Sequence, residues 1–363
     1  MLEIEFDLEP EVTATLAPAA AQAPPSNVGS SVASGSGANS SRSFPSAAPG
    51  GPPSKRPRHS GPPGAPAPIA PAGRLGALVA ALVQEGPPAG KTEVVVALRE
   101  LLVHGGLEAK EALAAVGGIK VLVALVCDGP PDGKAAAAGA LQNLSHNHDG
   151  GSASIASAGG IEALVALVRD GSPDGEVAAA NALYNLSRNH DGRSVSIAAA
   201  GGIEALVALV RDGSPEDKAA AARALCNLLF NHDGRKESIA SAGGIEALVA
   251  LVRDGSPEGK EVAARALDNL AHNHDGRSAS IASAGGIEAL VALVRDGSPK
   301  GKAAAAAVLE NLALDYAERS ASISLAGGIE ALEALVLRGS PEGKAAAASA
   351  LRNLSSNLAG GAR

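Results

Sequence analysis

The chain has few of the residues that fill ordinary globular cores. Its 363 residues include no tryptophan, one methionine, two tyrosines and three phenylalanines. Because aromatic side chains supply much of the buried area of most cores, this composition excludes an aromatic-rich globular core. Apolar residues nevertheless make up 46% of the chain. The core must therefore be aliphatic, and the abundant alanine predicts closely packed helices.

Cysteines and long apolar runs are also scarce. The two cysteines, Cys127 and Cys226, form neither a CxxC pair nor a disulfide framework, which fits a reducing intracellular compartment. The amino-terminal stretch MLEIEFDLEPE contains five acids and no base, so it lacks the positive start of a secretory signal. Apolar runs such as IEALVALV are shorter than the roughly 20 residues that span a bilayer. We expect a cytoplasmic or nuclear protein that does not insert into a membrane.

An excess of positive charge is missing as well. The formal net charge is -8, and no strong basic stripe occurs in the sequence. Since the neutralisation of phosphates dominates binding to nucleic acids, this charge balance argues against nucleic acid as the main ligand.

The amino-terminal part is rich in Pro, Ala, Ser and Gly. Large apolar side chains are scarce from Pro10 to about Gly73. Such a segment cannot bury enough surface to offset the conformational entropy of the chain. We therefore predict a disordered tail over residues 1–72 and a folded region over residues 73–363.

Two short motifs lie in this predicted tail. Lys55, Arg56 and Arg58 match a minimal basic pattern and form a candidate nuclear localisation signal, which an import receptor would reach in a disordered chain. The first residues, LEIEFDLE, alternate apolar and acidic side chains, which suits a short extended binding segment.

The rest of the chain is an internal repeat. The tripeptide Gly-Gly-Ile recurs with a spacing of 42 residues at every step, and its isoleucines are Ile119, Ile161, Ile203, Ile245, Ile287 and Ile329. A period in this range indicates stacked helical units, none of which buries its apolar face alone.

Each period predicts three helices, as the stretch 233–273 shows. The first is short, near residues 238–242, and stops at a Gly-Gly pair, where glycine adopts the left-handed conformation that ends a helix. The second, IEALVALVRD from Ile245, places four apolar side chains on one helical stripe. The third follows Ser256 and Pro257, where serine caps the free amides and proline takes the first helical position.

This pattern resembles the armadillo repeat family, which includes importin-α and beta-catenin. The motifs that carry the resemblance are Gly-Gly-Ile-x-x-Leu-Val-x-Leu at the start of the second helix and Ala-Leu-x-Asn-Leu in the third. The resemblance covers residues 73–363 and implies an all-α fold, a right-handed superhelical solenoid. Six full repeats are marked by Asn143, Asn185, Asn227, Asn269, Asn311 and Asn353. A partial repeat precedes them, from about Leu75 to His104, with Glu100 in place of the asparagine.

Positions that differ between the copies mark a candidate site. In the third helix three positions vary freely, and together with the asparagine they share one face about 100° wide. In armadillo proteins this face lines a concave groove in which asparagines hold the backbone of an extended peptide, and the resemblance implies the same role here. We expect these side chains to face solvent in the free protein. The candidate groove residues are Asn143, Tyr184, Asn185, Arg188, Arg223, Asn227, Phe230, Arg265, Asn269, Asn311 and Asn353.

The middle of this face gathers arginines and aromatics, which are frequent at interface hot spots. Its composition predicts a partner segment that is acidic or apolar. Importin-α-like proteins also carry Trp four residues before the asparagine, and no such position is Trp here, so binding of lysine-rich localisation signals is disfavoured. The alternative interpretation of the variable positions is neutral drift at a solvated surface.

Two other recurring patterns have a structural explanation. A His-Asp pair, as at His190 and Asp191, precedes most of the short first helices, and Asp is placed to cap the helix. Copies one repeat apart should lie about 10 Å from one another, which gives a ladder rather than a metal cluster. Ser-Pro pairs at the starts of third helices, from Ser172 to Ser340, indicate capping rather than phosphorylation.

Together these features predict an interaction scaffold rather than an enzyme. No set of nucleophile, base and acid stands out, so we expect no catalytic residues, no cofactor, no metal and no small-molecule substrate. The leading interpretation is a monomeric scaffold that binds an extended protein segment in its concave groove. A nuclear transport adaptor of the importin-α type is one alternative. A substrate-docking subunit of a ubiquitin ligase or another enzyme complex is the other.

Overall fold

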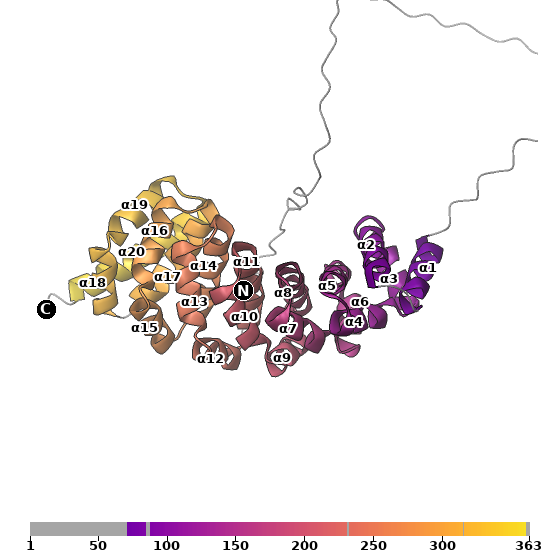
Figure 1. The fold of residues 1–363 in the computed structure, drawn as a ribbon. Helices are drawn as coiled ribbons and strands as arrows, with labels where there is room; N and C mark the ends of the chain where they lie inside the picture. Colours follow the sequence, from indigo (N-terminus) through magenta and orange to yellow (C-terminus); the bar gives the residue numbers. More distant parts are fainter. Residues whose placement is uncertain (1–70, 85–87, 231, 315, 361–363) are drawn as a thin grey trace, which may run out of the picture. The chain divides into compact units, whose positions relative to one another are not determined.

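A computed structural model describes residues 71–84, 88–230, 232–314 and 316–360. Within these residues the secondary structure consists of helices alone, so the prediction of an all-α fold is confirmed (Figure 1). The first helix begins at Pro71, close to the predicted start of the folded region. The candidate localisation signal, Lys55, Arg56 and Arg58, and the rest of the chain before Pro71 lie outside the described residues.

The helices fall into the three predicted classes. The short first helices are α3 (Gly106–Ala115), α6 (Asp149–Ser157), α9 (Asp191–Ala199), α12 (Asp233–Ser241), α15 (Asp275–Ser283) and α18 (Ala317–Leu325). The second helices are α1 (Pro71–Val83), α4 (Gly118–Asp128), α7 (Gly160–Asp170), α10 (Gly202–Asp212), α13 (Gly244–Asp254), α16 (Gly286–Asp296) and α19 (Gly328–Arg338). The third helices are α2 (Pro88–His104), α5 (Pro131–Ser145), α8 (Pro173–Ser187), α11 (Pro215–Leu229), α14 (Pro257–Ala271), α17 (Pro299–Ala313) and α20 (Pro341–Gly360). The partial repeat thus supplies a second and a third helix, α1 and α2.

The Gly-Gly pair separates the first helix from the second for two different reasons. Gly243 has a φ of 78°, a left-handed conformation that costs glycine little and other residues more. Gly244 has an ordinary φ, but a Cβ there would meet the carbonyl oxygen of Ile239 at 2.7 Å. The turn therefore needs one glycine for its conformation and the next for the close approach of the two helices.

The third helices begin as the sequence predicts. The hydroxyl oxygens of Ser214, Ser256, Ser298 and Ser340 each accept a hydrogen bond from the backbone N–H three residues later. Ser172 occupies the same place without this bond. Capping by serine is thus confirmed at four of these five helix starts.

The start of the first helices corrects the sequence prediction. Asp191 was expected to cap α9, but it is the first residue of the helix, and His190 precedes it as the N-cap. The imidazole Nδ1 of His190 accepts a hydrogen bond from the backbone N–H of Arg193 at 3.2 Å. In α6, α12 and α15 the Nδ1 atoms of His148, His232 and His274 accept the same bond from the backbone N–H three residues later. These histidines therefore stabilise helix starts.

We predict that His232→Ala lowers the free energy of unfolding by about 1 kcal/mol, because α12 loses its N-cap acceptor. His272→Ala is the control, since His272 is exposed and its ring has a bond only to the neighbouring Asn273. Urea denaturation followed by circular dichroism measures both changes. Equal losses in the two variants would show that the cap contributes nothing.

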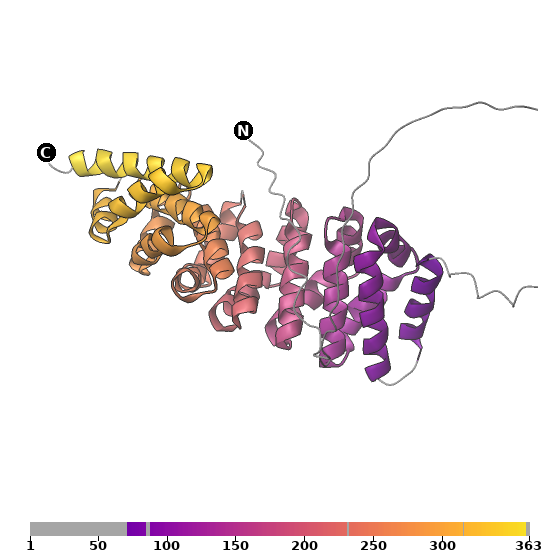
Figure 2. The same cartoon turned by 90° about the horizontal axis from the view of Figure 1, so that it is seen from above.

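The core is aliphatic and continuous along the stack. Ile203, Leu206, Val207 and Val210 of one second helix are all at most 2% exposed, and the corresponding residues of its neighbours are similarly buried. Alanines such as Ala180 are fully buried between third helices, where a small side chain lets two helices approach closely. Seen from above in Figure 2, the long helices of successive repeats lie side by side, in agreement with the contacts of α5, α8, α11, α14, α17 and α20.

A ladder of buried arginines joins the first helices α9, α12 and α18 each to the first helix of the preceding repeat, and the sequence did not predict this feature. Arg235 is 6% exposed. Its Nε donates to the carbonyl of Leu228 at 2.6 Å, and its Nη1 lies 2.8 Å from Asp191 of the preceding repeat. Arg193 and Arg319 make the same two contacts, with Asp149 and Asp275 as the acids. The Asp next to the capping histidine thus binds the following repeat.

None of the described helices is both long and apolar enough to cross a membrane alone. Four bent pairs of a first and a second helix would meet such a test together, by length and composition only.

Candidate functional site

The predicted site residues lie at matching positions of third helices that pack side by side. We call this surface the third-helix face. Besides the six asparagines it contains three variable positions in each repeat, two within the third helix and one that directly follows this helix in all repeats but the last. The variable residues are, repeat by repeat, Gly139, Gln142 and His146; Asn181, Tyr184 and Arg188; Arg223, Cys226 and Phe230; Arg265, Asp268 and His272; Ala307, Glu310 and Leu314; and Ser349, Arg352 and Ser356. In Figure 1 the labels of α5, α8, α11 and α14 stand above those of the second helices of the same repeats, α4, α7, α10 and α13, and the short helices α9, α12 and α15 lie at the lower edge. The structure therefore places the predicted residues on or directly after third helices that pack against one another in sequence.

One row of this face is exposed to solvent. It consists of the residues that directly follow the third helices, where the backbone turns from helical to extended; at Phe230 φ is -64° and ψ is 123°. Phe230 is 64% exposed, although it is one of the few aromatic residues of the chain. The exposed residues in this row are His146, Arg188, Phe230, His272 and Leu314.

The asparagines form a second, half-buried row. The Nδ2 of Asn185 donates to the carbonyl oxygen of Gln142 at 3.1 Å, and Asn227 donates to the carbonyl oxygen of Tyr184 at 3.2 Å. Asn353 repeats this contact with Glu310 at 3.1 Å. Each of these asparagines therefore binds the third helix of the preceding repeat.

Two asparagines of the row use a side chain as the acceptor instead. Asn311 donates to Oδ1 of Asp268 at 2.8 Å, and Asn269 contacts Sγ of Cys226 at 3.6 Å. The expectation that all candidate side chains face solvent is thus wrong for the asparagines. The reason is that the neighbouring repeat covers one edge of the third-helix face.

Tyr184 and Arg223 also depart from this expectation. Tyr184 is half-buried and packs against the hydrophobic core. Arg223 donates from Nη1 to Glu258 at 2.8 Å and from Nη2 to Asn181 at 3.2 Å, while its buried Nε has no hydrogen-bond partner. Arg223 is therefore held between the preceding and the following repeat.

The remaining arginines of the site are exposed. Arg188 donates from Nη2 to the side-chain oxygen of Asn147 at 2.8 Å, and Arg265 lies one repeat beyond Arg223 at the matching position. The hydrogen-bond partners of Arg223 and Arg188 come from neighbouring repeats or loops. A pattern within a single helix therefore could not predict these partners.

Two acids in the carboxyl-terminal half of the third-helix face, Asp268 and Glu310, have raised pKa values. Burial raises the pKa of Asp268 to about 6, and the nearby Glu310 adds to this rise, whereas His272 and the hydrogen bond from Asn311 oppose it. Burial also raises the pKa of Glu310, against the effect of Arg352. The face therefore changes from arginine-rich in its middle to weakly acidic towards its carboxyl-terminal end.

We predict that Asp268→Asn stabilises the fold at neutral pH by about 1 to 2 kcal/mol, because the charged carboxylate is poorly solvated there and asparagine keeps an acceptor for Asn311. The folded protein holds the Asp268 proton more tightly than the unfolded chain does. The contribution of protonated Asp268 to the stability of the fold is thus complete below the ordinary pKa near 3.8 and is lost as the pH rises through about 6. Urea midpoints of both proteins between pH 4 and pH 8 measure this effect; a difference that does not grow with pH would contradict it.

The third-helix face contains one cysteine, Cys226. Burial raises the pKa of the Cys226 thiol, which keeps it in its weakly nucleophilic protonated form. Among the residues that the structure describes, no three His, Cys, Asp or Glu side chains are grouped so that they could hold a metal ion.

The chain is a helical repeat protein, and comparisons with known proteins identify its kind. A model of the armadillo/beta-catenin-like repeat matches residues 108–146 and 232–272. An engineered protein of known structure is 33% identical over 77% of this chain and 68% of its own, with a TM-score of 0.71. A designed armadillo repeat protein is 25% identical over 66% of this chain and 99% of its own, with a TM-score of 0.60. The chain belongs to the armadillo repeat family.

A further designed armadillo repeat protein shares the fold with a TM-score of 0.59. It is 24% identical over 65% of this chain and 99% of its own, and its structure was solved in complex with the peptide (KR)4. No curated protein sequence gives a significant match to the chain.

Proposed function

We propose that this protein is a non-enzymatic, monomeric scaffold that binds an extended segment of another protein on its third-helix face. The observation that carries the proposal is the pair of parallel rows on this face. One row exposes side chains such as Phe230 and Arg188. The other is a row of half-buried asparagines, and those from Asn185 to Asn353 are each held by a contact with the preceding repeat. The backbone of an extended peptide that follows these rows would meet a similarly placed asparagine amide at successive repeats.

The bonds between repeats prepare the asparagines for this role. An asparagine amide has two N–H donors and one acceptor oxygen, so a single bond from Nδ2 orients the group without saturating it. Asn185 and Asn227 are oriented in this way by carbonyl groups of the preceding repeat. Side chains that are ordered before binding lose less conformational entropy when a peptide arrives.

The chemistry of the exposed row favours an acidic or apolar partner segment. In this row Arg188 supplies exposed positive charge, and Phe230 and Leu314 supply apolar surface. Arg265 of α14 adds a further exposed positive charge to the third-helix face. The designed armadillo protein bound to (KR)4 supports the idea that this fold accommodates a peptide. The arginines of the present face favour a ligand of the opposite charge.

Selection from a library of random peptides against the immobilised full-length chain tests this proposal. We expect the enriched peptides to combine Asp or Glu with aliphatic or aromatic residues, and to bind with an affinity that falls as salt is added. Enrichment of lysine-rich peptides would instead favour the importin-α type of adaptor. Failure to enrich any sequence would contradict the proposed function.

A further inference from the structure

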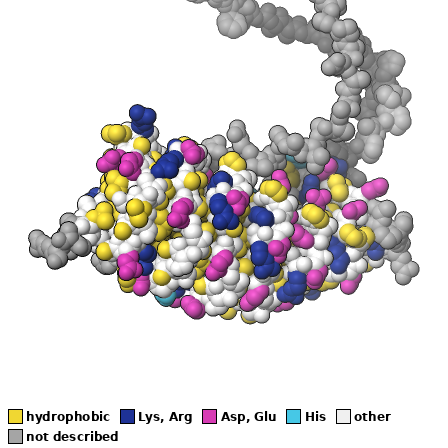
Figure 3. Space-filling model, turned by 60° about the vertical axis from the view of Figure 1, so that its left-hand side comes forward, with side chains coloured by type: hydrophobic (Ala, Val, Ile, Leu, Met, Phe, Trp, Pro, Cys, Tyr) yellow, Lys and Arg dark blue, Asp and Glu magenta, His cyan; other side chains and the backbone are white. Residues whose placement is uncertain are grey.

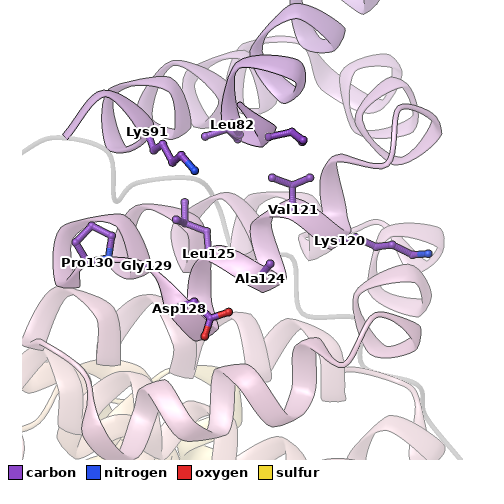
Figure 4. A pocket seen from close by; sticks show the side chains of 10 residues that line it. Leu82, Lys91, Lys120, Val121, Ala124, Leu125, Asp128, Gly129 and Pro130 are labelled. Atoms are coloured by element: carbon purple, nitrogen blue, oxygen red, sulfur yellow. The ribbon is translucent and has the colours of Figure 1, made fainter. Parts of the chain in front are cut away.

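An apolar depression lies away from the third-helix face, between the partial repeat and the first full repeat. It has a volume of about 510 Å³ and is lined by residues of α1, α2 and α4, among them Leu82, Val83, Lys91, Lys120, Val121 and Leu125. In Figure 4, Val121 and Leu125 rise from α4 towards Leu82 of α1. Lys91 reaches over the gap from α2, and Lys120 lies at the other end with its side chain extending away from the gap. None of these residues belongs to the third-helix face.

The same place is closed in the repeats that follow. At the positions that match Val121 and Leu125, Ala163 and Leu167 of α7 are 7% and 5% exposed, and Ala205 and Leu209 of α10 are 5% and 6% exposed. Val121 and Leu125 are only half-buried, and Val83 is 67% exposed. The packing of second helices that continues along the solenoid is thus incomplete at α1 and α4.

The charge beside the gap also differs from the charge in the other repeats. Lys120 stands on the second helix where each later repeat has a glutamate, and these glutamates are Glu162, Glu204, Glu246, Glu288 and Glu330. Lys91 of α2 adds a second positive charge to the lining. The carboxylate of Asp128 points away from the gap in Figure 4. The open apolar surface therefore coincides with a reversal of the local charge from negative to positive.

We propose that this depression, the α1–α4 pocket, binds an acidic amphipathic segment of a partner protein. Aliphatic side chains of the segment fill the gap between Leu82, Val121 and Leu125, and its carboxylates pair with Lys91 and Lys120. Charge complementarity selects the ligand, because an apolar segment with basic residues would bring like charges together. The α1–α4 pocket is a different site from the third-helix face, on which the proposed function depends.

Fluorescence anisotropy of the full-length chain with a short labelled peptide of alternating leucine and glutamate tests this pocket. Lys120→Glu restores the residue of the other repeats, so the variant should fold, and we expect its affinity to fall about tenfold at low salt. Val121→Ala also restores the residue of the other repeats, and we expect a loss of about fivefold from the smaller apolar contact. Glu162→Lys, the reverse exchange one repeat later, should not weaken binding.

Three results would contradict the proposal that the α1–α4 pocket binds an acidic amphipathic segment. They are the absence of binding to the wild-type chain, equal binding of a leucine-lysine peptide, and affinities of Lys120→Glu and Val121→Ala that stay within about twofold of wild type. Phe230→Ala separates the two sites, because it should leave binding in the pocket unchanged. If Phe230→Ala abolishes binding and Lys120→Glu does not, the peptide occupies the third-helix face and the pocket proposal is wrong.

Discussion

Replacing Arg235 with alanine is expected to lower the free energy of unfolding by about 3 kcal/mol, one of the largest losses for a single polar side chain in this protein. The guanidinium is almost fully buried, bonds to the carbonyl of Leu228 and pairs with Asp191 of the preceding repeat. Truncation removes these bonds and leaves a cavity between two repeats. Urea denaturation followed by circular dichroism measures the loss.

Arg253→Ala is the matched control for this prediction. Arg253 is exposed, and its ion pair with the adjacent Asp254 lies at the surface, so we expect a change below about 0.5 kcal/mol.

The hydrogen bond from Arg235 lowers the pKa of Asp191, so the stability that the Arg235–Asp191 pair provides is present above the ordinary pKa of Asp and is lost as the pH falls through the lowered value. The difference between wild type and Arg235→Ala should therefore shrink in acid. Equal losses for Arg235 and Arg253 would show that the ladder does not join the repeats.

Phe230→Ala is expected to weaken binding of a peptide selected on the wild-type chain by about 2 kcal/mol, or roughly 30-fold. Phe230 combines a large apolar area with high exposure at the centre of the third-helix face. Its removal should cost little stability, since the ring is mostly in solvent. Isothermal titration calorimetry with wild type and variant measures the loss.

Leu337→Ala is the control for the Phe230 variant. Leu337 is 74% exposed, but it lies on α19, a second helix. Peptide binding should be unchanged in this variant. If both variants lose the same affinity, or neither loses any, Phe230 is not the anchor of the site.

The architecture was predictable because it repeats. The 42-residue spacing of Gly-Gly-Ile, the single apolar stripe of each second helix and the Ser-Pro helix starts are local patterns, and each has a local physical cause. The same patterns placed the six asparagines at matching positions of the third helices, and five of them, from Asn185 to Asn353, contact the third helix of the preceding repeat.

What could not be predicted depends on contacts between repeats. A helical pattern shows which side chains share a face, but it does not show which edge of that face the next repeat covers. The half-burial of Asn185 and the two partners of Arg223 follow from this stacking. The choice of His190 over Asp191 as the cap was equally hidden, because both side chains can accept a hydrogen bond and the backbone of the turn decides between them.

The most direct test of the central claim is a variant that combines Asn185→Ala, Arg223→Glu, Phe230→Ala and Arg265→Glu. Because Asn185 and Arg223 bond within the protein, some loss of stability is expected, and circular dichroism must first show that the variant is folded at the temperature of the assay. The account predicts that the folded variant binds peptides selected on the wild-type chain at least about 100-fold more weakly. A folded variant that binds these peptides with wild-type affinity would contradict the proposal that the third-helix face is the binding site.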